Sequence, residues 1–425
     1  MKYTLLYIAA AAALFGLTAC GGQSTEKRSK EILSKVDISL LPCQNSDKKN
    51  FYVDELGDPV IMVDEARDFL RSRVKPAPFC DGLAFIGGMS SEKVFINKEG
   101  ETVIDCKEYG DDAEPVGEGF VGGMAYIYSK SSNETYVINT KGEIVVTIDG
   151  LVLSPFNEGY CLARQGDSLI ACSIVNLKGE TVFDANDGEF AFGTPYAFPT
   201  EYAVWDDEGF KYIMDIKTGK KWLEDVADIS RYLSSSSYPA FDYNNLCIAQ
   251  NDDRLYGLLN RKGEWVVEPQ FDEMKPDGEW YAVKSEGLWG WCDKTGAYTI
   301  EPQYKYGPNF FGIDKWAMIS GEKCYIDRQG IEVLEMPDED MRPLTNFFGD
   351  RAIVRIGLRD SRGRRSSSFT TVWIDREGNE ISSRFPLYTD QTQTGDPAEY
   401  YEHMSQSSTT LNHFFSIFYY NNIFF

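Results

Sequence analysis

Short apolar runs alternate with polar turns along most of this chain. The runs 136–138 and 288–292 are typical: each is a few residues long, rich in β-branched or aromatic side chains, and followed at once by Asn or Asp. Runs of this length are too short for amphipathic helices and have the composition of β-strands. The pattern therefore predicts an all-β fold.

Most of these runs end in the same turn, Asp or Asn followed three residues later by Gly. In Asp293-Lys-Thr-Gly296 the Asp side chain can bond the turn backbone, and the Gly supplies a positive φ without a Cβ clash. Nine copies occur, and the one from Asp215 to Gly219 carries an extra residue. We predict a structural turn role for their glycines, which are Gly57, Gly100, Gly142, Gly179, Gly219, Gly263, Gly296, Gly330 and Gly378.

The spacing of the turns indicates a tandem repeat. Successive turn glycines lie 43, 42, 37, 40, 44, 33, 34 and 48 residues apart, and a recurrence of this length is typical of repeat architectures. From residue 82 onward each unit opens with another strand, such as 280–283, so the predicted unit has three strands. Pro302 is expected to end its strand, because proline cannot donate to the ladder.

No three-stranded unit can bury its apolar face alone, so the units must stack. A closed, propeller-like ring of seven or eight blades is the favoured arrangement, since the uneven spacing suggests loop insertions on one face. The segment after Glu-Pro would then supply a fourth strand. The alternative is an open β-solenoid or superhelix.

Two neighbouring units share a longer motif. Trp289-Gly290 with the exit Glu301-Pro-Gln303 recurs thirty-three residues earlier as Tyr256-Gly257 with Glu268-Pro-Gln270. This motif resembles the WG-repeat (KWG-type) β-rich proteins, which are common in bacteria and often lipoproteins of Bacteroidales-type organisms. The resemblance covers roughly residues 50–385. It implies repeats and a surface location, and it brings no catalytic residue.

The N-terminus has the features of an export signal. Lys2 precedes an apolar run at 5–17, and Leu17-Thr-Ala-Cys20 looks like a lipobox. We expect residues 1–19 to be a lipoprotein signal peptide, Cys20 to carry lipid such as palmitate, and residues 20–36 to be a polar tether. The protein would then be exported and anchored in the cell envelope, at the outer membrane, on its periplasmic or its surface side.

The rest of the chain divides into three parts. Residues 37–80 form a leading segment with a divergent first repeat and a short helix expected at 64–73. Residues 81–385 form the repeat domain. Residues 386–425 are an aromatic tail, which is either a closing strand or non-native sequence.

Charge and histidine content exclude several functions. The formal net charge of −24 argues against binding nucleic acid or anionic lipid through bulk electrostatics. The two histidines, His403 and His413, both lie in the tail, so a His-based catalytic or metal site within the repeats is excluded. We expect no metal and no cofactor.

We expect the cysteines to have a structural rather than a catalytic or metal-binding role. Besides Cys20 there are eight, spread among the repeats without a Cys-x-x-Cys pair. Core packing is expected for most of them. An exported protein can form disulfides, and the pairing that we favour is Cys43–Cys80.

Several segments are candidate binding or catalytic features. Paired carboxylates at 111–112, 206–208, 252–253 and 338–340 lie at turns, yet two carboxyl groups in a cleft would suit a glycosidase. The insertion at 234–239 and the basic cluster at 359–368 are candidate loops, the second as either a solvated hairpin or a contact for an acidic partner. Sugar or protein contacts are further considered for Trp222, Trp280 and Tyr238.

The leading hypothesis is a non-catalytic, membrane-anchored repeat lipoprotein. It would act as a monomer and as a binding or scaffold module for a protein or glycan at the envelope. One alternative is a surface glycan-processing hydrolase that uses paired carboxylates. Another is a structural envelope protein without a specific ligand.

Overall fold

The predicted strands form many small sheets. The computed structural model describes residues 39–44, 49–63, 75–87, 92–117, 119–120, 122–154, 156, 158–165, 173–184, 189–192, 200–206, 209–224, 241–242, 244–277, 279–305, 316–319, 322–347, 349–359 and 362–386. In this part, 32 strands form nine antiparallel sheets, with one short 3₁₀ helix and no α-helix. The prediction of an all-β fold is confirmed.

The first four sheets are built in chain order. The first holds β1 (Leu41–Gln44), β2 (Asn50–Val53) and β3 (Pro59–Met62). The second holds β4 (Lys75–Pro76), β5 (Ala84–Gly87), β6 (Val94–Ile96) and β7 (Thr102–Asp105), after which comes the 3₁₀ helix η1 (Cys106–Tyr109). The third holds β8 (Glu114–Pro115), β9 (Met124–Ser129), β10 (Glu134–Asn139) and β11 (Ile144–Asp149). The fourth holds β12 (Leu151–Val152), β13 (Tyr160–Arg164), β14 (Ser173–Asn176) and β15 (Thr181–Phe183).

The remaining five sheets follow the same order. The fifth holds β16 (Glu189–Phe192), β17 (Glu201–Asp206), β18 (Gly209–Asp215) and β19 (Lys221–Trp222), and the sixth β20 (Cys247–Gln250), β21 (Tyr256–Leu259) and β22 (Trp265–Phe271). The seventh holds β23 (Glu273–Asp277), β24 (Trp280–Ser285), β25 (Leu288–Cys292) and β26 (Tyr298–Tyr304). The eighth holds β27 (Trp316–Met318), β28 (Cys324–Asp327) and β29 (Glu332–Glu335), and the ninth β30 (Met341–Pro343), β31 (Ala352–Arg359) and β32 (Arg365–Ile374).

The three-stranded unit predicted from the sequence is a minimum, and the predicted number of units is wrong. Five of the nine described sheets have a fourth strand; β23, for example, directly follows the Glu-Pro-Gln segment of the sixth sheet. Nine sheets replace the seven or eight expected, because each turn glycine belongs to a sheet of its own and the divergent first repeat forms a complete sheet. The spacing of the turns was a better guide than the usual size of propellers.

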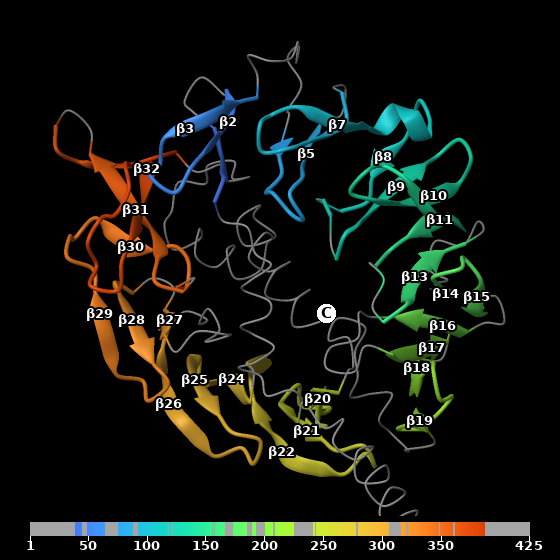
Figure 1. Cartoon of the computed structure of the whole chain (residues 1–425). Coiled ribbons are helices and arrows are strands. Elements are labelled where there is room, and N and C mark those ends of the chain that lie inside the picture. The colour runs from blue at the N-terminus through green and yellow to red at the C-terminus, as the bar shows by residue number, and fades with distance from the viewer. Residues whose placement is uncertain are drawn as a thin grey trace, which may run out of the picture.

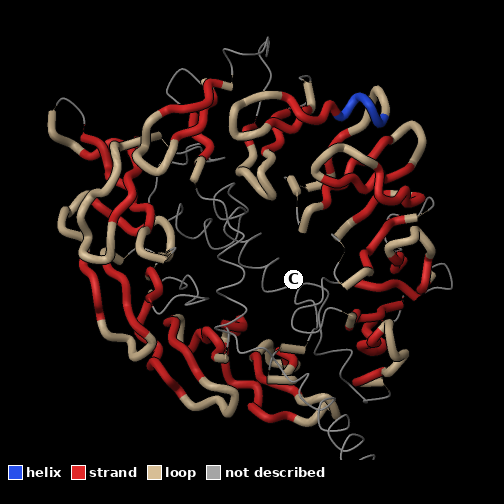
Figure 2. The backbone as a smooth tube through the Cα atoms, viewed as in Figure 1, coloured by secondary structure: helices blue, strands red, loops and turns tan. Residues whose placement is uncertain are grey.

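The sheets follow one another around a ring in chain order, and the last sheet lies beside the first (Figure 1). The tube view shows the same arrangement, with turns and loops at both ends of the strands (Figure 2). Within the eighth sheet, strands β27, β28 and β29 follow one another from the inside of the ring outward (Figure 1).

The hydrophobic core lies between neighbouring sheets rather than at one centre. Tyr52 and Ile61 of the first sheet, for example, pack with Phe79, Ile86 and Val94 of the second. Eight such clusters of described residues join the nine sheets in consecutive pairs. The second to eighth sheets are thus apolar on both faces, and they are stabilised mainly by their neighbours, as in other stacked repeats.

A phenylalanine ahead of a strand fixes several of these interfaces. Ring centroids lie 5.0 Å apart for Tyr52 and Phe79, and 4.9 Å apart for Tyr325 and Phe347. The tyrosine hydroxyls also donate across the interface, Tyr52 to the Ala77 carbonyl at 2.6 Å and Tyr325 to the Thr345 carbonyl at 2.8 Å. The equivalent position is buried in five sheets, as Phe79, Phe120, Phe156, Phe241 and Phe347.

The turn glycines take part in the same stacking. A Cβ on Gly100 would lie 3.1 Å from Ile61, and one on Gly330 would lie 3.1 Å from Ile300, each in the preceding sheet. A Cβ on Gly57 of the first sheet would lie 2.4 Å from the Ser383 carbonyl oxygen, which follows the last turn of the chain. The first sheet therefore contacts the last as each later sheet contacts its predecessor.

Polar contacts join the same two ends of the repeat array. The Ser383 amide donates to the Leu56 carbonyl at 2.7 Å, and the Gln44 amide donates to the Pro386 carbonyl at 3.3 Å. The Arg351 guanidinium lies 3.2 Å from the Glu55 carboxylate. These contacts span more than 290 residues of sequence.

Candidate functional site

The nine turns have the local chemistry that the sequence predicts. Their glycines lie at φ between 67° and 86°. In the seventh sheet, Asp293 Oδ1 accepts hydrogen bonds from the Thr295 amide at 2.7 Å and from the Ala297 amide at 3.2 Å. The Gly296 amide donates to the Asp293 carbonyl at 3.0 Å. The side chain thus occupies donors inside the turn, and the glycine takes the left-handed conformation that closes it.

Four turns carry a further contact that we did not predict. Where the first residue is Asn, its Nδ2 donates to a Glu placed directly after the glycine; for Asn260 and Glu264 the distance is 2.8 Å. The other pairs are Asn97–Glu101, Asn139–Glu143 and Asn176–Glu180. The recurrence of Asn-x-x-Gly-Glu in the sequence was the signal for it.

The turn aspartates predict a specific response to acid. Hydrogen bonds from Thr295 hold the pKa of Asp293 below its ordinary value. The group therefore adds stability above its unfolded pKa of about 3.9, and this stability is lost as pH falls through the lower folded pKa. In Asp293→Asn the amide oxygen can still accept, as Asn260 does. We expect little change in the urea midpoint at pH 7 and a smaller loss than wild type between pH 5 and 3. The reverse change, Asn260→Asp, serves as the control and should add acid sensitivity; an equal acid loss in all three proteins would contradict the assignment.

The paired residues Trp289 and Gly290 have separate structural roles. The Trp289 side chain is 5% exposed and packs in the cluster between the seventh and eighth sheets. A Cβ on Gly290 would lie 2.5 Å from the Ile300 carbonyl oxygen and 2.7 Å from the Pro302 nitrogen. Only glycine fits here, because the neighbouring strand backbone crosses directly over it.

The degenerate copy repeats this geometry. A Cβ on Gly257 would lie 2.3 Å from the Val267 carbonyl oxygen and 2.9 Å from the Pro269 nitrogen. Its neighbour Tyr256 is half-buried against the cluster between the sixth and seventh sheets. Tyrosine therefore takes a packing position beside the glycine, as Trp289 does.

The expectation that Pro302 ends its strand is wrong. Strand β26 continues to Tyr304, and the register pairs Trp289 with Tyr304 and Trp291 with Ile300. Three residues, 301–303, therefore lie opposite the single Gly290. Proline is tolerated because it sits in a bulge, where no ladder hydrogen bond is required of its nitrogen.

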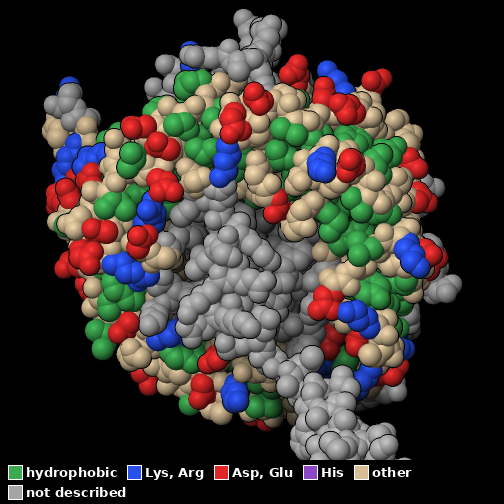
Figure 3. Space-filling view, in the orientation of Figure 1, with side chains coloured by type: hydrophobic (Ala, Val, Ile, Leu, Met, Phe, Trp, Pro, Cys, Tyr) green, Lys and Arg blue, Asp and Glu red, His purple; other side chains and the backbone are tan. Residues whose placement is uncertain are grey.

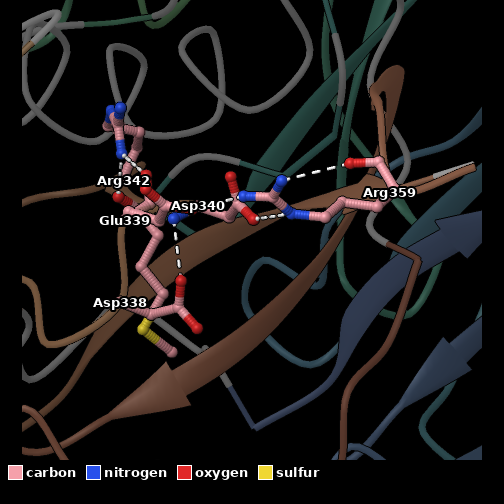
Figure 4. Close-up of polar contacts among 7 residues, drawn as sticks. Asp338, Glu339, Asp340, Arg342 and Arg359 are labelled. Atoms are coloured by element: carbon pink, nitrogen blue, oxygen red, sulfur yellow. Dashed lines mark hydrogen bonds and ion pairs between the residues drawn. The ribbon is translucent and has the colours of Figure 1, made fainter.

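The basic cluster forms a projecting arm with its own counter-charges. Strands β31 and β32 extend beyond the other strands of the ninth sheet, and Lys and Arg side chains gather on the projecting segment at the upper left of Figure 3. Arg359 donates to Asp340 at 2.6 Å and to Glu339 at 2.5 Å, and also to the Gly363 carbonyl (Figure 4). Ion pairing with the acidic run 338–340 thus offsets part of the arm's positive charge.

Asp112 and the acidic run 338–340 are engaged in structural contacts, whereas residues 207 and 208 of the run 206–208 lie outside the described residues. Asp338 accepts from the Asp340 amide at 2.8 Å, while Glu339 and Asp340 face Arg359. Asp112 accepts from the Ser129 and Ser131 hydroxyls, which lowers its pKa although its partial desolvation opposes this. Within the described ranges no group of three or more His, Cys, Asp or Glu side chains is placed to hold a metal ion.

The candidate aromatic residues are covered by cations. The Arg261 guanidinium lies 4.3 Å from the ring centroid of Trp222, and Lys220 Nζ lies 5.0 Å from it. The Arg328 guanidinium lies 5.2 Å from the ring of Trp280. Each arginine comes from the turn of the following sheet, so these rings contribute to stacking between sheets.

The cysteines of the described residues are free thiols, and six of the seven are buried. The pairing Cys43–Cys80 is therefore not formed. Burial raises the pKa of Cys106, Cys161, Cys292 and Cys324, each to about 12. Thiols in this state are poor nucleophiles.

Other predicted features lie outside the described residues. These are the lipid site Cys20, the signal peptide and tether, the expected helix at 64–73, the insertion at 234–239 with Tyr238, Cys172, and the tail after residue 386. In the part that is described, no helix is long and apolar enough to cross a membrane.

Comparison with known proteins places the motif in a repeat family. Residues 256–289 match the family model described as WG containing repeat. This chain carries a WG-containing repeat. The matched stretch runs from Tyr256 to Trp289 and so joins the two motif copies. No curated protein matches the sequence significantly.

Solved structures show distant likenesses of fold. BamB from Moraxella catarrhalis is 14% identical with a TM-score of 0.34, and the alignment covers 70% of this chain and 94% of that one. Apo AztD from Citrobacter koseri is 10% identical with a TM-score of 0.31, covering 82% and 94%. Apo prolyl oligopeptidase B from Galerina marginata is 10% identical with a TM-score of 0.39, covering 80% and 65%.

Proposed function

We propose that this WG-repeat chain is an exported, lipid-anchored β-propeller that serves as a non-catalytic binding or scaffold module for a protein or glycan at the cell envelope. The main support for a closed ring is the contact of Gly57 with Ser383, which repeats the contact that later turn glycines make with the sheet before them. A ring closed in this way gives a rigid support whose loops vary in length. Such loops are the usual place for binding residues.

The use of charged side chains supports a non-catalytic role. The carboxylates of Glu339 and Asp340 face Arg359, and Asp112 accepts from two serine hydroxyls. A glycosidase needs one carboxyl group held as an acid and a second available as base or nucleophile. Carboxylates bound to arginine or to hydroxyls are poorly suited to either role.

The anchor is tested by acylation. Cells expressing the full chain are fed an alkyne analogue of palmitate, and the label on the protein is read after coupling to a dye. We expect labelling of the wild type and none of Cys20→Ser. Equal labelling of both, or of neither, would remove the anchor from the proposal.

The binding role is tested with envelope polysaccharides. The full mature chain is incubated with labelled polysaccharides, and both retention and product release are measured. Retention without new products is the expected result. Turnover that is lost on carboxylate substitution would instead make this protein a hydrolase.

A further inference from the structure

The nine turns lie at one end of the strands, and we call this end of the ring the turn face. It consists of the Asp or Asn to Gly segments 54–57, 97–100, 139–142, 176–179, 215–219, 260–263, 293–296, 327–330 and 375–378. Each connects a strand to its outer antiparallel neighbour, so equivalent turns of successive sheets lie at equivalent ends. The hairpin that carries the Arg359 arm lies at the opposite end of its sheet.

The residues between the Asp or Asn and the Gly of each turn are mainly basic, although the chain as a whole is acidic. The whole sequence has 42 basic and 66 acidic residues. The tips of the nine turns have nine basic residues against three acidic ones, Glu55, Glu99 and Glu377. The basic residues are Lys98, Lys141, Lys178, Lys217, Arg261, Lys262, Lys294, Arg328 and Arg376.

The lysines and arginines of these tips differ in exposure. The three arginines are half-buried and stack on aromatic rings between sheets. All six lysines are exposed. Two exposed leucines accompany them, Leu56 at 60% and Leu177 at 47% of their surface. Lysine beside exposed leucine is a combination suited to a lipid interface, where the apolar part enters and the ammonium group stays among the headgroups.

The chain also enters the ring at the turn face. Leu41 of β1 pairs with Val53, the last residue before the first turn. Ser39 lies at the same end, and its hydroxyl accepts a hydrogen bond from Lys98 of the second turn at 3.1 Å. A tether that joins the protein to a membrane would therefore attach on the side that carries the lysines.

We infer that the turn face docks on an anionic phospholipid surface, so that the ring lies with its turns against the membrane and the Arg359 arm pointing away. This orientation rests on the proposed anchored function. The net charge of −24 does not oppose it strongly, because charges more than about 8–10 Å from the headgroups are screened at physiological salt. Carboxylates also flank the tips. The turn aspartates Asp54, Asp215, Asp293, Asp327 and Asp375 accept amide hydrogen bonds within their own turns, and Glu101, Glu143, Glu180 and Glu264 bind asparagine amides.

The test uses the full mature chain with Cys20→Ser, so that no acyl chain contributes to binding. Its flotation is measured with phosphatidylcholine vesicles that contain or lack phosphatidylglycerol. The turn variant changes Lys141, Lys178, Lys262 and Lys294 to Gln. A charge-matched control changes Lys130, Arg254, Arg362 and Arg364, from the opposite end, to Gln.

We expect binding that requires phosphatidylglycerol and weakens as salt is raised. Each lysine at an anionic surface contributes roughly fivefold in affinity, so the turn variant should bind at least tenfold more weakly while the control binds like its parent. A variant with Arg at the same four positions should keep binding, which separates loss of charge from loss of fold. Binding without lipid preference, no binding, or equal losses in both Gln variants would overturn the inference.

Failure here and failure of the anchor are distinguishable. Acylation at Cys20 is read in cells by palmitate labelling and does not depend on the turn lysines. Vesicle binding is read on protein without the acyl group. If the protein is acylated in cells but does not bind anionic vesicles, the proposed anchor stands and the proposed orientation is wrong.

Discussion

Replacing Gly290 by alanine is expected to destabilise the seventh sheet by about 3 kcal/mol, the upper end of the range for overpacking. The new methyl group would lie 2.5 Å from the Ile300 carbonyl oxygen and 2.8 Å from the Glu301 carbonyl carbon. Both atoms belong to backbone, so no change of rotamer relieves the clash, and the bulge of β26 must open. Hydrogen exchange of amides in β25 and β26 should then accelerate more than in sheets across the ring, because stacked repeats lose stability locally.

Gly119→Ala is the matched control for this change. A Cβ at Gly119 would meet no atom within 4 Å, and its φ lies outside the left-handed region. Its urea midpoint should equal that of the wild type. If Gly290→Ala unfolds with the same midpoint as Gly119→Ala, the close approach of the two strands is not what requires glycine in this motif.

Replacing Arg261 by alanine is expected to cost about 3–5 kcal/mol, the range for removing one partner of a buried ion pair. Its guanidinium nitrogens lie 2.9 and 3.2 Å from the two oxygens of Glu201, whose side chain is only 9% exposed. The same group stacks on Trp222 and Phe241, each with its ring centroid 4.3 Å away. The variant would leave a buried carboxylate of the fifth sheet without this partner from the sixth.

The pH dependence of this variant has a definite sign. Burial raises the pKa of Glu201, and Arg261 opposes that rise. Without Arg261 the folded pKa rises further above its unfolded value, and the variant loses stability as pH increases through that folded pKa. Arg261→Ala should therefore be closer to wild type at pH 5 than at pH 8 in urea denaturation.

Two companion variants isolate the buried pair. Arg261→Ala combined with Glu201→Gln should be more stable than Arg261→Ala alone at pH 8, because no buried charge remains. Lys262→Ala changes the exposed neighbour in the same turn and should stay within about 0.5 kcal/mol of wild type. A double variant as unstable as the single one at both pH values would assign the loss to stacking rather than to the ion pair.

The parts of the fold that the sequence predicts are those determined by interactions between residues close together in the chain. The turn at Asp293 is specified by residues within five positions of each other, so its side-chain hydrogen bonds and the positive φ of Gly296 follow from the sequence. The sequence did not predict that the strand continues past Pro302. The bulge there depends on the residue opposite, Gly290, and that pairing is set by the register of the two strands. The two glycines and two prolines of the repeated motif were the available signal.

Contacts between sheets were beyond the reach of single-sequence reasoning. Arg261 and Glu201 are sixty residues apart, and nothing near either one marks its partner. Trp222 and Trp280 were considered as exposed binding residues, whereas arginines of the next sheet cover them. The interface phenylalanines Phe79, Phe120, Phe156 and Phe241 lie 21 to 23 residues before their turn glycines and could have been found by aligning the units on those glycines. Phe347 lies 31 residues before Gly378, because the long β31–β32 arm comes between them.

The most direct test of the closed ring is a disulfide between its first and last sheets. In Leu56→Cys with Ser383→Cys, the backbone hydrogen bond of 2.7 Å between these residues places the two α-carbons within disulfide range. A second pair, Leu56→Cys with Thr218→Cys, joins positions about halfway round the ring and serves as the control. After mild oxidation, non-reducing electrophoresis should show a faster-migrating monomer for the first pair and none for the second. Failure of the first pair to form an intramolecular disulfide in the folded protein would contradict closure and favour an open array of sheets.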